Sequence, residues 1–196
     1  MKTVKVNAST SYDILIAKGL LERTGELCST AVSPCKVCIV SDDRVAPLYL
    51  KGVNESLMRA GFDTVSFVFP NGEASKNTAT LIELVEFLAE NQLTRTDCLV
   101  ALGGGVVGDM CGFAAAIYLR GIKFIQIPTT LLAAVDSSVG GKTAVDLVAG
   151  KNLAGAFHQP SRNMRPQHPQ HTFARDIRGR LCRGCKVRSY RRQRAV

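Results

Sequence analysis

A short apolar run that ends in three consecutive glycines limits the fold of this chain more than any other feature. Asp97–Ala101 has the composition of a buried β-strand, Leu102 leads from it into Gly103–Gly105, and Met110–Leu119 then has the pattern of a helix. Glycines at a strand-to-helix junction let the backbone turn sharply and approach a ligand closely. Free N–H groups at the start of a helix attract phosphate. The junction therefore predicts a pyrophosphate-binding turn, with a tight structural turn as the alternative.

The chain up to about Phe157 alternates β-rich runs with helical stretches, which is typical of an α/β fold with a parallel sheet. Besides the strand before the glycines, strands are expected at Lys2–Val6, Asp13–Ala17, Lys36–Ser41, Thr64–Phe69 and Lys123–Ile127. Helices are expected at Gly19–Ser29, Val45–Ala60 and Thr78–Asn91, the last with Asn77 or Thr78 as its N-cap. The glycine spacing differs from the common Gly-x-Gly-x-x-Gly, and no acidic residue follows at the usual distance, so a related but distinct dinucleotide fold is expected.

Charge divides the chain of 196 residues into two parts. Residues 161–196 hold 11 of the 25 Lys and Arg residues and one of the 16 acidic residues, so residues 1–160 are nearly neutral. We expect one α/β domain over 1–160 and a basic segment over 161–196 that cannot bury enough apolar surface to fold. The alternative, a basic arm that binds nucleic acid, is disfavoured because only Phe173 and Tyr190 interleave aromatic rings.

Neither a secretory signal nor an apolar run long enough to span a membrane is present, so we expect a cytoplasmic protein without a membrane partner. The seven cysteines are odd in number and scattered, which favours a reducing compartment. The spacing of Cys35 with Cys38 and of Cys182 with Cys185 suits half a zinc site each. The first pair lies at a predicted strand, where neighbouring ligands would face opposite ways.

A second group of candidate site residues follows the expected strand Lys123–Ile127. Lys142 and Lys151 supply ammonium groups for a phosphate or carboxylate, Asn152 can donate and accept, and Asp136 can hold a substrate hydroxyl. Solvated loop charges are the alternative. The turn Pro70–Lys76 is a third such place, and a surface ion pair between its Glu73 and Lys76 is the alternative there.

In combination these segments resemble the 3-dehydroquinate synthase family of the shikimate pathway. Motifs in family order carry the resemblance across nearly all of residues 1–160: Ser41-Asp42 with Val45-Ala-Pro-Leu-Tyr49, Pro70-x-Gly-Glu-x-x-Lys76, Gly103-Gly-Gly-Val-Val-Gly-Asp109, Tyr118-x-Arg-Gly121, Pro128-Thr-Thr-Leu-Leu132, Asp136-Ser-Ser-Val-Gly-Gly-Lys-Thr-Ala-Val-Asp146 and Gly150-Lys-Asn-Leu-x-Gly-x-Phe157. The resemblance implies the parallel-sheet dinucleotide-binding domain of the dehydroquinate synthase type, without that family's C-terminal helical domain. Arg44 is a departure, because some members have a ribose-contacting Asn there.

The resemblance also implies roles for the matched residues. NAD contacts are expected from Asp42, Asn71, Gly72, Glu73, Ala74, Ser75, Lys76, Gly104, Gly105, Val106, Val107, Gly108, Asp109, Thr129, Thr130, Lys142 and Lys151. Asp136, Lys142 and Asn152 are expected to hold the substrate hydroxyls and phosphate, and Arg120 to reach the phosphate bound by a neighbouring subunit of a homodimer. The substrate in this family is a phosphorylated sugar acid, 3-deoxy-D-arabino-heptulosonate 7-phosphate. Transient oxidation of a ring hydroxyl by NAD, phosphate elimination, reduction and ring closure convert it to 3-dehydroquinate, on the route to chorismate and the aromatic amino acids.

A divalent metal, zinc or cobalt, completes the family's site, held by a glutamate and two histidines of the C-terminal domain. His158, His168 and His171 do not match those positions, so the metal ligands are expected to be absent here. When the codons of Ser161–Ala195 are read one base later, permitted choices spell a string that resembles the family's next segment, beginning A-V-I-C-D-P and including A-E-V-V-K-Y-G. We therefore expect one extra base near the Pro160 codon.

Two other functions stay open from the sequence. One is a metal-dependent polyol or alcohol dehydrogenase, or a related sugar-phosphate cyclase, that shares the glycine turn. The combination of the Gly72–Lys76 and Asp136–Lys142 motifs disfavours the dehydrogenase. The other is an NAD-binding fragment without turnover, which the expected loss of the metal ligands favours for this chain.

Overall fold

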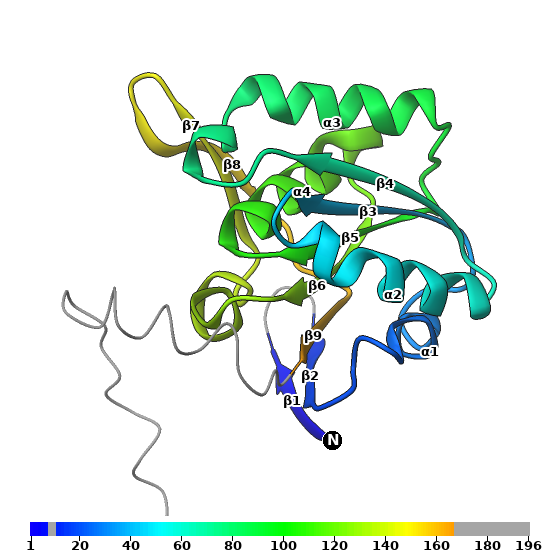
Figure 1. Ribbon diagram of the computed structural model, residues 1–196. Helices are drawn as coiled ribbons and strands as arrows, with labels where there is room; N and C mark the ends of the chain where they lie inside the picture. The colour runs from blue at the N-terminus through cyan, green and yellow to red at the C-terminus, as the bar shows by residue number, and fades with distance from the viewer. Residues whose placement is uncertain (8–10, 167–196) are drawn as a thin grey trace, which may run out of the picture.

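A computed structural model describes residues 1–7 and 11–166, and a seven-stranded, mostly parallel sheet forms their centre (Figure 1). The strands lie in the order β1 (Lys2–Val6), β2 (Tyr12–Ala17), β9 (Arg162–Pro166), β6 (Lys123–Pro128), β5 (Cys98–Gly103), β3 (Lys36–Asp42) and β4 (Asp63–Phe69). Only β1 pairs antiparallel within this sheet, with β2. The α/β class and every strand predicted above are confirmed.

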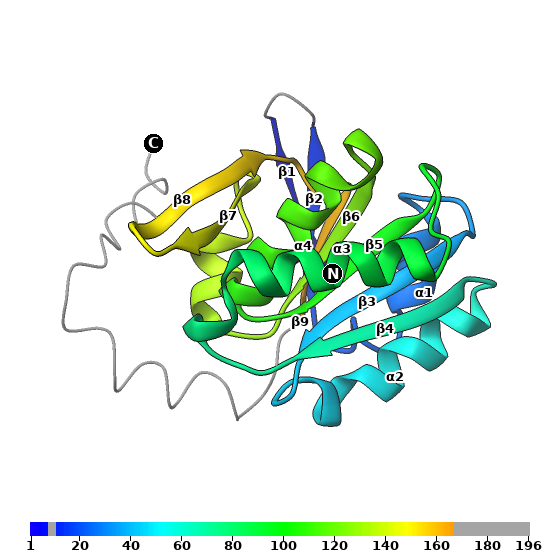
Figure 2. The same ribbon diagram turned by 90° about the horizontal axis from the view of Figure 1, so that it is seen from above.

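Helices cover both faces of the sheet because its strands alternate apolar side chains to the two sides. On β3, Val37 and Ile39 pack with α1 (Thr24–Ser29) and α2 (Ala46–Arg59). Cys38 and Val40 face the opposite layer, which contains α3 (Thr78–Glu90) and α4 (Gly105–Ile117) (Figure 2). Because these central strands are buried on both faces, they read as continuous apolar runs in the sequence.

The N-cap of α3 is Asn77, as predicted, since its side chain accepts a hydrogen bond from the Thr80 N–H at 2.9 Å. Two other helix starts were wrong. The helix expected from Gly19 begins only at Thr24, because Gly19 has a φ of 69° and leaves the helical region. The helix expected from Met110 already begins at Gly105, where burial against the sheet outweighs the low helix propensity of glycine and valine.

A two-stranded antiparallel hairpin, β7 (Lys142–Leu147) and β8 (Gly150–Phe157), lies outside the main sheet and packs on α4 (Figures 1 and 2). Gly112 of α4 allows this contact, because a Cβ at that position would overlap the Thr143 side chain. No strands were predicted here. In the sequence, polar and glycine-rich segments of this kind look like loops, because their strand structure depends on packing against a neighbouring helix.

Three short helical turns complete the described residues: η1 (Glu73–Ser75), η2 (Tyr118–Arg120) and the π-helical η3 (Ala133–Ser137). Within the described residues no helix is both long and apolar enough to cross a membrane.

The sheet continues past the domain boundary expected at residue 160. β9 lies between β2 and β6, with Met164 and Asn163 fully or almost fully buried. Strand pairing on both sides therefore overrides the absence of a strand pattern in the sequence. The remainder of the segment interpreted as an unfolded basic tail, 167–196, lies outside the described residues, as do Cys182, Cys185, His168 and His171.

The residues of β9 fit their position poorly. An interior parallel strand is normally an apolar run, yet Arg162 and Asn163 occupy this one. The Arg162 Nε and the Asn163 Oδ1 are buried without a hydrogen-bond partner in the described chain. A buried polar atom left unsatisfied costs about 1–3 kcal/mol. The reading displaced by one base permits valine and isoleucine at these two positions, which is the composition that an interior strand requires.

The displaced reading predicts a stability change. The double substitution Arg162→Val with Asn163→Ile should raise the free energy of unfolding by about 1 kcal/mol, because removing the unsatisfied Arg162 Nε and Asn163 Oδ1 outweighs losing the Asn163 Nδ2 bond to the Ser138 carbonyl and the long Arg162–Asp13 pair. Urea denaturation followed by circular dichroism measures the change. Arg95→Val, at an exposed position, is the control and should stay within about 0.5 kcal/mol. A loss of stability in the double variant would count against the displaced frame.

Candidate functional site

The carboxyl ends of four neighbouring strands meet at one edge of the sheet and bring the predicted segments together. Ser41 lies opposite Leu102, Asp42 opposite Phe69, and Gly103 opposite Pro128. The loops that follow β3, β4, β5 and β6 therefore start side by side. Ligands of open α/β sheets bind outside this edge, so the topology alone identifies the candidate site.

The glycine turn joins β5 to α4 at the centre of this edge. The Thr129 N–H donates to the Gly103 carbonyl at 2.9 Å, which holds the loop after β6 against the turn. A Cβ on Gly105 would lie 3.1 Å from the Ser137 hydroxyl, so the absence of a side chain permits the close packing of η3. Gly104 is the N-cap and no side chain caps the helix. The N–H groups of the first turn of α4 can therefore bind an anion.

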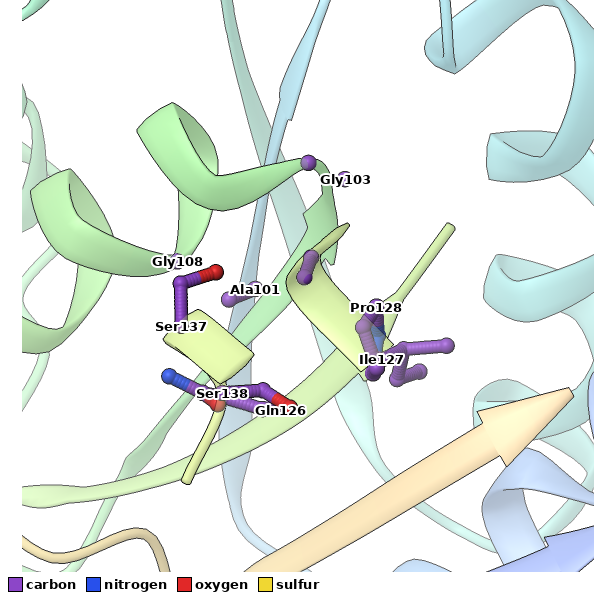
Figure 3. Close-up of a pocket in the computed structure, with 10 residues that line it drawn as sticks. Ala101, Gly103, Gly108, Gln126, Ile127, Pro128, Ser137 and Ser138 are labelled. Carbon is purple, nitrogen blue, oxygen red and sulfur yellow. The ribbon is translucent and has the colours of Figure 1, made fainter. Parts of the chain in front are cut away.

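A small cavity of about 10 Å³ lies beneath the turn (Figure 3). The Gln126 and Ser138 side chains line it together with backbone of the turn, and Ser137 points from η3 toward the start of α4. Its volume matches about one water molecule. This cavity is too small for a nucleotide. A nucleotide could therefore bind only on the outer side of the turn.

A buried ammonium group connects three of the predicted segments. Lys76 is 5% exposed, and its Nζ lies 2.6 Å from Asp109 Oδ2 and 2.6 Å from Asn152 Oδ1. Burial raises the pKa of the Asp109 carboxyl, and the hydrogen bond and charge of Lys76 oppose that rise. The structure thus brings together Lys76 from the loop after β4, Asp109 from α4 and Asn152 from the hairpin.

A second, larger cavity of about 510 Å³ opens between η3, α4 and the hairpin. Asp109, Asp136, Lys142 and Asn152 line it, with Phe157 at its apolar side. Lys142 forms no ion pair within residues 1–7 and 11–166. Its ammonium group is therefore available to an anionic ligand, and the Asp136 carboxylate to a hydroxyl. The volume lies in the range of small-molecule sites.

The ion pair between Glu73 and Lys76, the alternative interpretation of this turn, does not form. Glu73 instead binds Lys151 of β8, with 2.9 Å between Oε1 and Nζ, and both side chains are largely exposed. An exposed pair of this kind contributes about 0–1 kcal/mol. The pair nevertheless joins the loop after β4 to the hairpin.

Asp42 lies at the end of β3, beside the glycine turn. Its Oδ1 accepts hydrogen bonds from the N–H groups of Arg44 at 3.0 Å and Val45 at 2.9 Å, at the start of α2. Spacing along the chain does not reveal Asp42, which only the resemblance selected, because β3 precedes β5 in the chain but lies next to it in the sheet. Adjacency in a sheet, not spacing in sequence, decides which acid is near the turn.

Asp43 was not predicted as a site residue. Its Oδ1 accepts hydrogen bonds from the Asn71 backbone N–H at 3.0 Å and side-chain amide at 2.7 Å. These bonds lower the pKa of the Asp43 carboxyl. Asp43 thereby fixes the loop that begins at Asn71, and the only signal in the sequence was an acidic residue directly after a strand.

Arg120 does not join this site within the chain. It lies in η2, beyond the C-terminal end of α4, whereas Asp109 is in the first turns of the same helix. A helix of 13 residues is about 20 Å long. A contact of Arg120 with a site on a second copy of the chain, which the resemblance implies, stays a prediction.

The described residues contain no group of three or more His, Cys, Asp or Glu side chains that could hold a metal ion. The His158 Nε2 is hydrogen-bonded to the Ile122 carbonyl at 2.8 Å, and its ring stacks on Phe124. Cys35 and Cys38 pack against opposite faces of the sheet, as expected for a strand. None of the three is a metal-ligand candidate in this arrangement.

The family model described as 3-dehydroquinate synthase N-terminal matches residues 66–175 of this chain. A 3-dehydroquinate synthase of Streptococcus suis is 53% identical over 152 residues, which cover 78% of this chain and 43% of the relative. That of Paracoccus denitrificans is 51% identical over 160 residues, covering 81% of this chain and 44% of the relative. The chain therefore spans less than half the length of these curated relatives.

Solved structures of sugar-phosphate cyclases share the architecture. A 2-deoxy-scyllo-inosose synthase complexed with carbaglucose-6-phosphate, NAD+ and Co2+ has a TM-score of 0.78 and 29% identity, covering 84% of this chain and 44% of that one. A 2-epi-5-epi-valiolone synthase of Streptomyces hygroscopicus with NAD+ and Zn2+ bound has a TM-score of 0.72 and 30% identity, covering 83% and 45%. A glycerol dehydrogenase of Schizosaccharomyces pombe is 16% identical, with a TM-score of 0.64 over 84% of this chain and 39% of that one, and shares the fold.

The Lys76–Asp109 pair generates a prediction about acidity. In Lys76→Met, the pKa of the Asp109 carboxyl should rise further, because burial then acts without the opposing ammonium group. An acid whose pKa is higher in the folded state binds protons more tightly when folded. The free energy of unfolding should therefore increase as the pH falls from the raised pKa toward about 3.9, the usual value for Asp.

Carbon-detected NMR titration of the Asp109 carboxyl measures this shift, and urea denaturation at several pH values measures the stability. Lys51→Met, at an exposed position of α2, should change neither quantity. At neutral pH the Lys76→Met variant should lose about 3 kcal/mol of stability, as expected when one partner of a buried pair is removed. An unchanged Asp109 pKa would contradict this account of the site.

Proposed function

Because this chain belongs to the 3-dehydroquinate synthase family, we propose that it forms the NAD-binding half of such an enzyme and one wall of its substrate cleft. The observation that carries the proposal is the convergence of the uncapped first turn of α4 with the Lys76, Lys142 and Asp136 groups at one edge of the sheet. The reaction proposed for the complete enzyme is the conversion of a phosphorylated seven-carbon sugar acid to 3-dehydroquinate and phosphate.

The glycine turn fits the pyrophosphate of NAD. The N–H groups that follow Gly104 are not capped by a side chain, so they can donate to phosphate oxygens. Asp42 lies at the adjoining strand end with one carboxylate oxygen engaged by α2. Its second oxygen can accept from a ribose hydroxyl. Thr129 and Thr130 border the turn from the loop after β6 and complete the proposed cofactor contacts.

The residues around the larger cavity suit the substrate. Asp136 accepts from a substrate hydroxyl, Asn152 donates or accepts through its amide, and Lys142 balances the charge of a phosphate or carboxylate. When bound, NAD would accept a hydride from a ring carbon of the substrate. The resulting ketone would make the neighbouring C–H acidic, so that phosphate could leave. The chain's own groups orient the sugar acid and stabilise its anionic ends during these steps.

The metal of the family does not fit the described residues, because they contain no suitable ligand group. No step of the proposed mechanism is therefore assigned to a metal in this chain. Homodimer formation, with Arg120 reaching a phosphate bound by a second copy, belongs to the same proposal, and so does a cytoplasmic location.

A polyol or alcohol dehydrogenase is the rival among enzymes. The dehydrogenases with this architecture are 15–19% identical and share the fold alone, whereas the 3-dehydroquinate synthases are about half identical over three quarters of the chain. A fragment that binds NAD without turnover is the second alternative. It is consistent with the lack of a suitable ligand group among the described residues.

Phosphate release separates these possibilities. The chain of 196 residues should bind NAD in isothermal titration calorimetry but release negligible phosphate from 3-deoxy-D-arabino-heptulosonate 7-phosphate with NAD and zinc, because half of the cleft is not supplied. A full-length family member is the positive control. Phosphate release at its rate would contradict the predicted lack of turnover, and absence of NAD binding would contradict the proposed function itself.

Cofactor choice supplies a sharper test of Asp42. In Asp42→Asn the side-chain carbonyl can still accept from the Arg44 and Val45 N–H groups, but the negative charge that opposes a 2′-phosphate is removed. The ratio of NADP to NAD affinity should therefore rise at least about tenfold, equivalent to about 1.4 kcal/mol. Titration calorimetry with both cofactors measures it. Glu55→Gln on α2 is the matched control and should leave the ratio unchanged.

A further inference from the structure

An irregularity in the β7–β8 hairpin lies next to the buried Lys76 ammonium. Val145 pairs with Ala154 and Leu147 with Gly150, so that Asp146 alone on β7 lies opposite the three residues 151–153 of a β-bulge in β8. Bulges re-aim a side chain and often lie near functional sites. Asp146 does not line either cavity of the site, so it acts on any ligand only through other residues.

The backbone and side chain of Asp146 close a ring of hydrogen bonds. Its N–H donates to the Lys76 carbonyl at 2.8 Å. Its Oδ1 accepts from the Asn152 N–H at 2.7 Å. The Asn152 Oδ1 in turn accepts from the Lys76 Nζ at 2.6 Å. Each of the three residues is therefore both a donor and an acceptor, and the ring joins the loop after β4 to the hairpin.

The ring also explains an uncommon backbone conformation. Asn152 has a φ of 56°, in the left-handed region that Asn tolerates better than most residues. Its N–H donates to the Asp146 carboxylate, because Asn152 lies outside the paired positions of the hairpin. Without that acceptor, nothing in the ladder would hold Asn152 in the orientation that directs its amide oxygen to Lys76.

We propose that Asp146 is a positioning residue for the site: it fixes Asn152 so that the amide oxygen of Asn152 and the carboxylate of Asp109 together hold the Lys76 ammonium in one place. The same contact sets the position of the hairpin, which carries Lys142 and Lys151, relative to the loop Gly72–Lys76. The consequence for NAD affinity rests on the proposed function. The positioning of the ammonium group does not.

The Lys76 ammonium supplies a readout that a purely structural bulge would not change. Its low exposure and two short hydrogen bonds should slow the exchange of its protons with water, so that nitrogen-edited NMR detects it in the unmodified chain. In Asp146→Ala that exchange should become about fivefold faster, because one hydrogen bond of average strength is lost. In Asp146→Asn the exchange should remain within about twofold of the original rate, because the side-chain carbonyl still accepts from Asn152.

Asp63→Ala is the matched control, since Asp63 begins β4 at the opposite end of the sheet and is exposed. It should leave the ammonium signal unchanged. If Asp146→Ala does not fold, amide hydrogen exchange of the unmodified chain gives a second test. The Asn152 N–H should then be protected although its residue is exposed. Equal ammonium exchange in Asp146→Ala and Asp146→Asn, or an unprotected Asn152 N–H, would overturn the proposal.

Titration with NAD separates this proposal from the proposed function. If the chain binds NAD, the dissociation constant should increase about fivefold in Asp146→Ala and less than twofold in Asp146→Asn. If the unmodified chain does not bind NAD, the proposed function fails, and the ammonium signal alone decides the role of Asp146. An affinity loss of the same size in both variants would show that the charge of Asp146 acts and not its hydrogen bond, which would also overturn the proposal.

Discussion

The buried ammonium of Lys76 is the point at which separate parts of this chain are tied together. A lysine that is almost fully removed from water requires partners, because an unpaired buried charge is costly. Asp109 and Asn152 supply oxygen atoms from a helix and a hairpin that are far apart in sequence. The loop after β4, the start of α4 and the β7–β8 hairpin can therefore keep their charges buried only in one mutual arrangement. That arrangement defines the shape of the site.

The glycine turn contributes the second part of the site through backbone atoms. Side chains are excluded there by close packing of η3 and of the loop after β6, so the N–H groups of the first turn of α4 remain unblocked. The two parts complement each other: the turn offers fixed dipoles for phosphate, whereas Lys76, Lys142 and Lys151 offer charges on segments outside the central sheet. The proposed dinucleotide and the proposed phosphorylated sugar acid both need this combination.

β9 shows how far strand pairing alone can impose structure. Its residues have no strand pattern, yet its backbone is held between β2 and β6. Its buried polar atoms without partners show that its residues do not suit an interior strand. An interior position in the sheet favours apolar residues. The displaced reading permits such residues at the positions of Arg162 and Asn163.

The sequence by itself determined the alternation of strands and helices, the glycine turn after β5 and the set of residue types available for chemistry, because periodicity and local backbone preference act over short distances. It also carried the resemblance from which the site residues were selected. Only the tertiary structure decided that Asp42 lies beside the turn, that Glu73 binds Lys151 and not Lys76, that Arg120 lies away from the site, and that Asp146 closes a ring with Asn152. These outcomes depend on which strands are neighbours in the sheet and on where a hairpin packs on a helix, and such long-range contacts leave no periodic trace in the chain.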